Sequence, residues 1–168
     1  DAIFDSFERS DPSPGRHTED SFTFLNRVAA PTWQRVRELV DAWYRDYPAE
    51  SRADLRSRFR DPDAAQPYGA WWELYVYTLF RRMKYDVTIH PTLRASSRQP
   101  DFLITRGEEA IYVECVVALV RAGAITGVGK GERSWIFDVT NEASNPDFMV
   151  DIDILQSAPQ RPKKTEII

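Results

Sequence analysis

Apolar residues recur at helical spacing in three segments of the first half of the chain. From Trp33 to Tyr47 they return every three or four positions, and Pro48 ends the pattern. A shorter helix is predicted from Ser51 to Phe59, where the breaker sequence Asp61-Pro62-Asp63 follows. The third segment, Tyr68 to Met83, carries a stripe rich in aromatic residues. The pattern therefore predicts three helices before the first strand.

Short runs rich in β-branched and other apolar residues follow these helices. Asp86 to His90, Asp101 to Thr105 and Ile111 to Val117 each have the length and composition of a strand. Arg106-Gly107-Glu108-Glu109 supplies the polar, glycine-containing connection that a β-hairpin needs. We therefore expect Phe102 to Ile104 to pair antiparallel with the strand that follows.

The last third of the chain predicts one more helix and one more strand. A glycine-rich connection from Arg121 to Glu132 leads to a predicted helix at Arg133 to Ala143. From Phe148 to Leu155 apolar residues occupy alternate positions, as in a strand with one buried face. The order predicts an α/β core of helix, three-stranded meander, helix and strand, preceded by N-terminal helices. The predicted parts are a flexible lead-in at 1–20, a helical extension at 21–63, the α/β core at 64–156 and a tail at 157–168.

Three carboxylates stand at informative places in this pattern. Glu73 lies at the border of the apolar stripe of its helix, Asp101 follows Pro100 at a strand start, and Glu114 lies inside the next strand. An ionised carboxylate within an apolar strand is costly unless a cation or hydrogen-bond donors compensate its charge. The sequence therefore predicts that the three acids converge on a divalent metal ion.

Each acid also has an ordinary structural explanation. Asp101 can simply begin a strand, because aspartate favours turns. Glu114 can lie at the sheet edge with its carboxylate in water, and Glu73 can be a surface glutamate paired with Arg81 or Lys84. These alternatives stay open at the level of the sequence.

The order of a helical glutamate, a Pro-Asp pair at a strand start and a Glu-x-x sequence in the following strand resembles the PD-(D/E)XK nuclease superfamily. That superfamily includes restriction enzymes, junction resolvases and repair nucleases, and the resemblance covers Gln66 to Gln156. It implies a restriction-endonuclease-like core that hydrolyses phosphodiester bonds of DNA or RNA. It also implies that Mg²⁺, or Mn²⁺, is held by Asp101, Glu114 and Glu73.

The superfamily's motif ends in a lysine two residues after its second acid, and this chain has Val116 there. Because side chains two apart in a strand point to the same side, that lysine would stand beside Glu114. Val116 can neither ligate a metal nor donate a hydrogen bond to an attacking water. Lys130, in the glycine-rich segment, is the substitute catalytic residue that we expect, and Arg94 or Arg98 is the alternative.

Two functions are consistent with these residues. The first is a Mg²⁺-dependent nuclease. The second is a catalytically degenerate nuclease-like domain that binds nucleic acid or another protein, because the motif lysine is replaced. A third reading, a structural module without a ligand, predicts no response to metal and no salt-dependent binding to nucleic acid.

The net charge of −4 argues against a general binder of polyanions, but the charges are unevenly distributed. Residues 1–100 hold 15 Lys+Arg and 15 Asp+Glu, whereas residues 101–168 hold 7 and 11. Arginines of the neutral first part could therefore contact phosphates. The candidates for nucleic-acid binding are Arg94, Arg98, Arg81 and Arg82. The reading that we favour for the other helical arginines is a solvated surface paired with Asp54, Asp61 and Asp63.

Composition bounds the location of the protein. No apolar stretch is long enough to span a bilayer, and the chain does not begin with the pattern of a signal peptide. Its one cysteine, Cys115, excludes an internal disulfide framework. We therefore expect a cytoplasmic protein. Because the chain begins with Asp1 rather than Met, we expect that it can be a piece of a longer protein with further domains. A homodimer is the other protein partner left open.

Overall fold

The computed structural model describes residues 2–63, 65–93, 99–118, 130–142, 152, 154 and 163–166, without the side chains of Lys130 and Glu166. The chain forms two compact units. The first comprises Asp1–Ser13 and Ser21–Ala118, and the second comprises Pro14–Asp20 and Leu119–Ile168. These limits differ from the predicted core at 64–156, because the chain after Ala118 belongs to the second unit.

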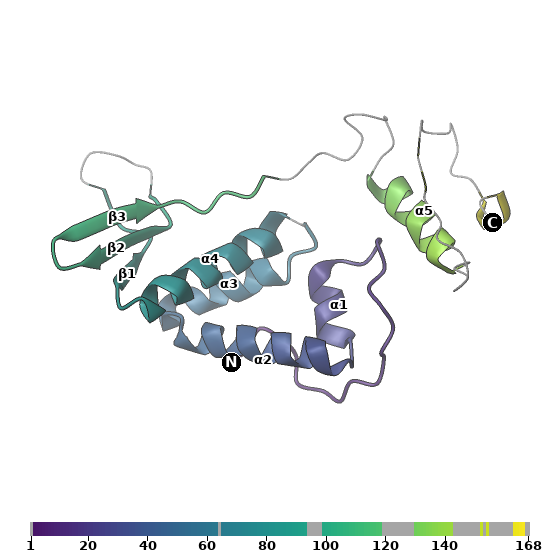
Figure 1. Ribbon diagram of the computed structural model, residues 1–168, viewed down its shortest axis with the longest axis horizontal. Coiled ribbons are helices and arrows are strands. Elements are labelled where there is room, and N and C mark those ends of the chain that lie inside the picture. Colours follow the sequence, from purple (N-terminus) through teal and green to yellow (C-terminus); the bar gives the residue numbers. More distant parts are fainter. Residues whose placement is uncertain are drawn as a thin grey trace. The chain divides into compact units, whose positions relative to one another are not determined.

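Among the described residues of the first unit, four α-helices build its helical part (Figure 1). They are α1 (Ser21–Arg27), α2 (Pro31–Asp46), α3 (Arg52–Phe59) and α4 (Ala65–Arg82), and the single 3₁₀ turn η1 (Ala49–Ser51) leads into α3. The three helices expected from apolar spacing are confirmed as α2, α3 and α4. Helix α2 starts at a proline, which fits the first turn because that position needs no backbone N–H.

The end of α4 is fixed by two backbone hydrogen bonds that run back over its last turn. The N–H of Tyr85 donates to the carbonyl of Phe80 at 3.0 Å, and the N–H of Lys84 donates to that of Arg81 at 3.1 Å. Lys84 has a φ of 66°, the left-handed conformation that this Schellman motif requires. The rings of Phe80 and Tyr85 pack edge to face at 5.6 Å and close the motif. The chain therefore turns sharply from the helix into the sheet.

The sheet is an antiparallel meander of β1 (Asp86–Ile89), β2 (Phe102–Arg106) and β3 (Glu109–Val113). The chain is thus a mixed α/β protein, and the predicted antiparallel hairpin is confirmed. Its turn consists of Gly107 and Glu108, and Gly107 has the φ of +60° that the first position of a type II′ turn needs. The last strand ends at Val113, four residues before the predicted end at Val117.

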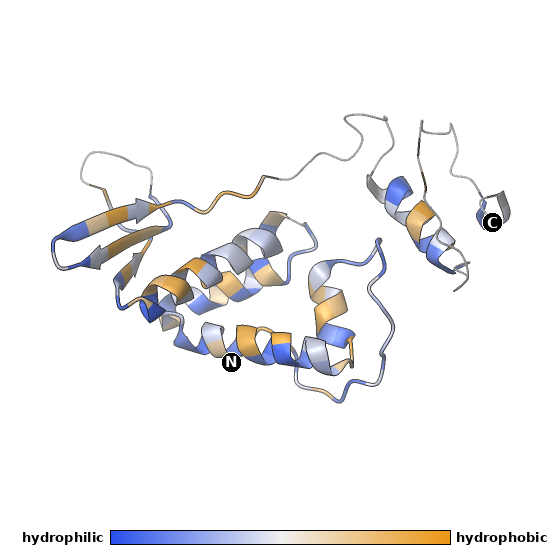
Figure 2. Cartoon of the chain, in the orientation of Figure 1, coloured by the Kyte–Doolittle hydropathy of each residue, from blue (hydrophilic) through white to orange (hydrophobic). Residues whose placement is uncertain are grey.

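The core of the first unit lies between α4, its neighbouring helices and the sheet. Phe102 and Ile104 of β2 are fully buried, together with Leu74 of α4, Tyr44 of α2 and Leu55 of α3. Figure 2 shows hydrophobic residues along the strands and in α2 and α4. Packing on the core-facing side of β2 therefore fixes which residues of the sheet face the helices.

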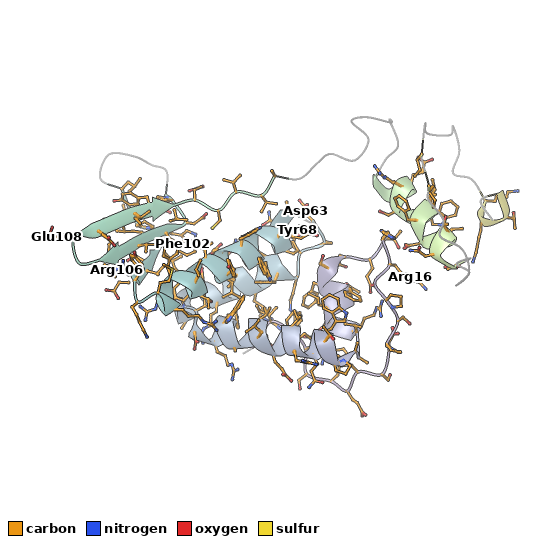
Figure 3. The ribbon with its side chains drawn as sticks, viewed as in Figure 1. Arg16, Asp63, Tyr68, Phe102, Arg106 and Glu108 are labelled. Atoms are coloured by element: carbon orange, nitrogen blue, oxygen red, sulfur yellow. The ribbon has the colours of Figure 1, made fainter. Side chains whose placement is uncertain are left out.

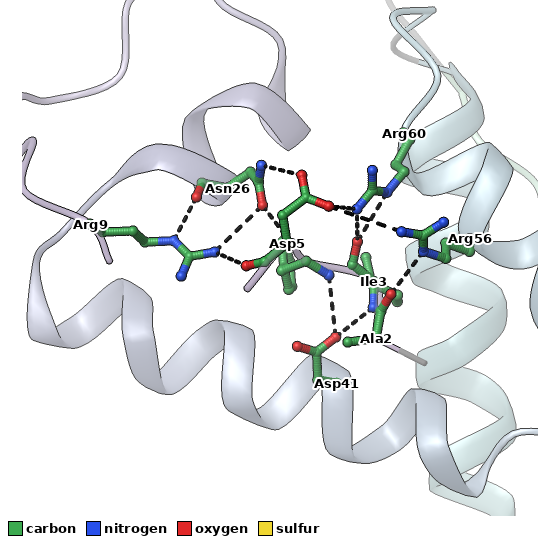
Figure 4. Close-up of polar contacts among 9 residues, drawn as sticks. Ala2, Ile3, Asp5, Arg9, Asn26, Asp41, Arg56 and Arg60 are labelled. Carbon is green, nitrogen blue, oxygen red and sulfur yellow. Dashed lines mark hydrogen bonds and ion pairs between the residues drawn. The ribbon is translucent and has the colours of Figure 1, made fainter. Parts of the chain in front are cut away.

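The beginning of residues 1–20, which we expect to be a flexible lead-in, packs against the helices. Ile3 and Phe4 are buried in the core. The N–H of Ile3 donates to Asp41 Oδ1 at 2.7 Å, and Arg60 Nη2 donates to the carbonyl of Ile3 at 2.9 Å (Figure 4). Asp5 is held by Arg60 as well, and this hydrogen bond lowers the pKa of the Asp5 carboxyl. The beginning of the segment, up to Ser13, is therefore part of the first unit.

The second unit contains α5 (Lys130–Glu142), which confirms the helix predicted at Arg133 to Ala143, and the 3₁₀ turn η2 (Lys164–Glu166). Asp138 of α5 accepts hydrogen bonds from the backbone N–H groups of His17 and Thr18, at 2.6 and 3.0 Å. The strand predicted from Phe148 to Leu155 lies outside the described residues, apart from Ile152 and Ile154. Among the helices that the structure describes, none combines the length and hydropathy needed to cross a membrane.

Candidate metal centre

Three side chains from three elements meet at one end of the sheet. Glu73 comes from the middle of α4, His90 directly follows β1, and Asp101 directly precedes β2; a ligand atom of each lies within 4.8 Å of those of the other two. The sheet register brings two of these three residues together, because Ile89, which precedes His90, pairs with Phe102, which follows Asp101. His90 and Asp101 are therefore opposite each other, and the His90 N–H donates to the Asp101 carbonyl at 2.9 Å.

Glu73 is buried, at 3% exposure, and its charge is compensated within the protein. Its Oε1 accepts a hydrogen bond from Tyr47 Oη at 2.5 Å, and its Oε2 accepts one from Arg58 Nη2 at 2.6 Å. A buried carboxylate needs such partners, since desolvation of an unpaired charge costs several kcal/mol. The alternative explanation of Glu73 as a surface glutamate paired with Arg81 or Lys84 does not hold, because Glu73 is buried and its ion-pair partner is Arg58 of α3.

Glu73 shifts the pKa values of both of its partners. Burial and the hydrogen bond to Glu73 raise the pKa of the Tyr47 hydroxyl far above its ordinary range, so Tyr47 stays a donor. Burial alone would lower the pKa of Arg58, but the ion pair with Glu73 raises it. The two hydrogen bonds, one to each carboxylate oxygen, hold the Glu73 side chain in a fixed orientation.

His90 adopts a backbone conformation that is unusual for a residue other than glycine. Its φ is 46°, in the left-handed region, where histidine is found more often than most residues but still at a cost of about 1–3 kcal/mol. Its side chain is exposed, whereas Glu73 behind it is buried. Strain of this kind collects at functional sites, and here it places an imidazole at the solvent-facing side of the group.

Asp101 is held by the segment that follows β3. Its Oδ2 accepts a hydrogen bond from the backbone N–H of Cys115 at 2.5 Å. Burial, and then the charges of Asp101 and Glu73, raise the pKa of the Cys115 thiol to about 12. Cys115 therefore faces the two acids as a neutral thiol at physiological pH, which makes it neither a nucleophile nor a thiolate ligand.

The structure does not bring Glu114 into this group. Val113 and Cys115 pack against the core, whereas Tyr112, Glu114 and Val116 are exposed, Val116 at 79%. This alternation puts Glu114 and Val116 on one side of the chain, as expected, but on the side away from α4. Among the described residues, Glu114 does not belong to the set of ligand atoms within 4.8 Å of one another.

The remaining predicted residues lie apart from the group or outside the described residues. Arg81 and Arg82 are exposed at the end of α4, which is roughly 12–14 Å along the helix from Glu73. Arg81 pairs with Asp86 at 3.5 Å. Arg94, Arg98 and the side chain of Lys130 lie outside the described residues, so their roles stay predictions.

The donor set fits a divalent transition-metal ion better than Mg²⁺. Carboxylates suit Mg²⁺ and Mn²⁺, whereas imidazole suits transition metals such as Fe²⁺ and Zn²⁺. Mn²⁺ is the transition-metal ion that shares the preference of Mg²⁺ for carboxylates. Asp101 and His90 would supply the outer ligands. Glu73 retains a second lone pair on each oxygen for a cation. Its ion pair with Arg58 weakens that contribution, because the guanidinium already balances its charge.

Sequence reasoning missed three members of this site: His90, Tyr47 and Arg58. His90 was interpretable only as a strand end, although antiparallel pairing of its strand with the Pro-Asp strand would have placed it opposite Asp101. Nothing in the sequence marks Tyr47 and Arg58, because they reach Glu73 through the packing of α2 and α3 on α4. Comparisons with protein families, with curated proteins and with solved structures found no match to this chain.

Proposed function

We propose that the chain is a metal-dependent phosphodiesterase that acts on nucleic acid, with the cation held by Asp101, His90 and Glu73. The observation that carries this proposal is the meeting of a buried helical carboxylate, a strand-start carboxylate and an exposed imidazole within 4.8 Å. Nucleic acid is the substrate class that the resemblance of the Glu73 and Pro100-Asp101 arrangement to PD-(D/E)XK nucleases implies.

The residues of the site would divide the work. Asp101 and His90 bind the cation from the solvent side, and Arg58 with Tyr47 holds Glu73 in place behind them. When bound, the cation supplies a Lewis acid for a phosphoryl oxygen and lowers the pKa of a coordinated water. The exposed position of His90 leaves an approach for a phosphate.

Calorimetric titration with Mn²⁺ tests the metal site. Wild-type chain should bind Mn²⁺ more tightly than Mg²⁺, and Asp101→Ala and His90→Ala should each weaken Mn²⁺ binding at least tenfold. Asp86→Ala is the matched control, because Asp86 is an acid at the opposite end of β1 from His90, and its side chain is 89% exposed. Indistinguishable heats for wild type and Asp101→Ala would remove the metal site and the proposed activity with it.

A second candidate function is a catalytically degenerate nuclease-like module that binds nucleic acid or protein without cutting. The residues of the last strand and its extension that face the core are Val113 and Cys115. Neither side chain can replace the acid or the lysine of the resembled motif, and that specific observation favours this candidate.

Restoring the amine distinguishes the two. Cys115→Lys places a lysine on the side of Asp101 and Glu73, whereas Val116→Lys places it on the exposed side. If wild type nicks plasmid or single-stranded DNA with Mn²⁺, and Asp101→Ala stops this, the chain is a nuclease. If only Cys115→Lys cuts, the chain is degenerate. Val116→Lys should change neither outcome.

A further inference from the structure

Helix α4 is apolar on two opposite sides. One side, with Ala70, Leu74 and Tyr77, is buried in the core. On the opposite side, residues one helical turn apart form what we call the outer stripe, which consists of Tyr68, Trp72, Tyr75, Leu79 and Met83. Tyr68, Trp72 and Met83 are 48%, 45% and 47% exposed. A helix whose outward face is mostly apolar is ordinarily covered, so this stripe marks an interaction surface.

Ring contacts make the middle of the outer stripe rigid. Tyr75 stacks on Trp71 at 5.4 Å with an interplanar angle of 3°, and Trp72 meets it edge to face at 5.7 Å. Trp43 of α2 contacts Tyr75 as well, at 6.0 Å, and Leu39, one turn earlier on α2, is 45% exposed. The surface is therefore a preformed aromatic patch, and its side chains lose little conformational entropy when a partner covers it.

The outer stripe carries a hole at one end and projecting side chains at the other. A cavity of about 480 Å³ opens beside the start of α4, where Tyr68 lies (Figure 3), and its lining includes Phe24, Trp33, Trp71 and Trp72. The far end presents the exposed side chains of Leu79 and Met83. Methionine is unbranched and adaptable, which suits it to fill an irregular apolar hole.

The two ends of α4 also differ in charge. Asp61 and Asp63 stand directly before the helix, and Arg81, Arg82 and Lys84 stand at its end. Two such helices placed antiparallel bring the acidic end of each beside the basic end of the other and oppose their dipoles. A parallel pair would bring like charges together.

We propose that two copies of the chain associate through the outer stripe, with their α4 helices antiparallel about a twofold axis near Tyr75. A twofold interface must carry both the hole and the group that fills it on one surface, and this stripe does. With the axis near Tyr75, Met83 of each copy faces the cavity beside Tyr68 of the other. The seam from Tyr68 to Met83 is roughly 22 Å long.

A second copy fits this surface better than nucleic acid does. Aromatic side chains also stack on bases, but single-stranded binding surfaces combine them with a track of cations. The described residues place a cation at the end of α4, where Arg82 lies over Trp43 at 5.9 Å, and one beside the cavity, where Arg27 lies over Phe24 at 5.6 Å. Helix α4 itself has no Lys or Arg between Ala65 and Phe80, so these cations do not form a track along the stripe. The association is independent of the proposed metal site, because Glu73 faces the core.

Sedimentation equilibrium of the chain over a range of concentrations tests the association. We expect a mass that rises to twice that of the chain, and Trp72→Glu should weaken the dimer roughly thirtyfold while leaving the circular dichroism spectrum unchanged. Phe7→Glu is the matched control, because Phe7 is 49% exposed but lies outside α4, and it should leave the dimer intact. A wild-type chain that stays monomeric at all concentrations overturns the proposal.

Cysteine cross-linking tests the geometry on a Cys115→Ala background, which leaves no other thiol. Tyr75→Cys, near the axis, should cross-link to itself, whereas Tyr68→Cys alone should not. Mixing Tyr68→Cys with Met83→Cys should produce a hetero-cross-link. Equal self-cross-linking at Tyr68→Cys would overturn the antiparallel arrangement. A monomer whose binding to a single-stranded oligonucleotide is lost in Trp72→Glu would assign the stripe to nucleic acid instead.

Discussion

Arg58 of α3 donates from Nη2 to Oε2 of Glu73 on α4, and the 2.6 Å contact joins the two helices beneath the candidate metal centre. The side chain of Arg58 is 26% exposed, whereas that of Glu73 is 4% exposed. The pair therefore has one partner that water reaches and one that it does not. Glu73 depends on Arg58 for its charge balance, and Asp101 and His90 are left as the ligands exposed to exchange.

Loss of Arg58 should destabilise the protein more than loss of any surface ion pair. In Arg58→Ala the buried carboxylate of Glu73 has no countercharge, which should lower the free energy of unfolding by about 3 kcal/mol. Asp54→Ala is the control, because Asp54 makes the other ion pair of Arg58 on the surface and should cost at most about 0.5 kcal/mol. Urea denaturation measures both, and equal effects would show that Glu73 does not rely on the pair.

Cys115 can report the arrival of a cation without any assay of activity. It is the one cysteine of the chain, and its thiol pKa is raised to about 12 by burial and by the charges of Asp101 and Glu73. A cation bound between these acids should lower that pKa, so Mg²⁺ or Mn²⁺ should accelerate alkylation by iodoacetamide several-fold at pH 8.5.

The alkylation has a direct control in Asp101→Asn. This variant should raise the rate without metal, because one of the charges that oppose the thiolate is gone, and the rate should no longer depend on metal. Mass spectrometry of the modified chain follows both reactions. Metal-independent alkylation of the wild type would place the cation elsewhere.

The same thiol makes stability fall at alkaline pH. An unfolded cysteine has an ordinary pKa of 9.0, whereas the folded value is about 12, so between these values the unfolded state loses its proton first. The contribution is fully present below pH 9 and declines as pH rises toward 12. Unfolding of Cys115→Ala should therefore lose less stability than wild type between pH 9 and pH 10.5, and parallel curves would contradict the shift.

Lys84 occupies a backbone position that glycine would fill at less cost. Its φ of 66° completes the end of α4, and a side chain in that conformation costs about 1 kcal/mol. Lys84→Gly should raise the free energy of unfolding by about 0.5–1 kcal/mol. Lys84→Ala removes the same charge but keeps the strained Cβ, so it should change stability by less than about 0.5 kcal/mol. Thermal unfolding of the three proteins separates strain from charge.

Much of the first unit could be predicted because its elements are strongly periodic. The apolar stripes of α2 and α4 and the glycine turn between β2 and β3 gave the helices and the hairpin. The meeting of Glu73 with Asp101 was also predicted, as part of a convergence of three acids of which the structure brings two together. The burial of Ile3 and Phe4 was not predicted, because two apolar residues in a polar segment show no periodic pattern.

The orientation of Glu114 could not be predicted, because alternation tells which residues share a side but not which side is buried. The two-residue turn sets the register so that Phe102 pairs with Val113. Phe102 is fully buried, so Val113 points inward with it and Glu114 outward. A turn one residue longer would have reversed this outcome. The alternation within β2 does not apply to Asp101, because Asp101 precedes that strand.

The tight turn at Gly107 and Glu108 offers a handle for spectroscopy. Arg106 and Glu108 lie at the outer tip of the hairpin, away from Phe102 at its other end (Figure 3). The tip is roughly 16 Å along β2 from Asp101. An NMR label attached through Glu108→Cys, with Cys115 replaced by alanine, would keep the three candidate ligands and the backbone N–H that donates to Asp101. It would still be close enough for a paramagnetic ion bound there to broaden its signal.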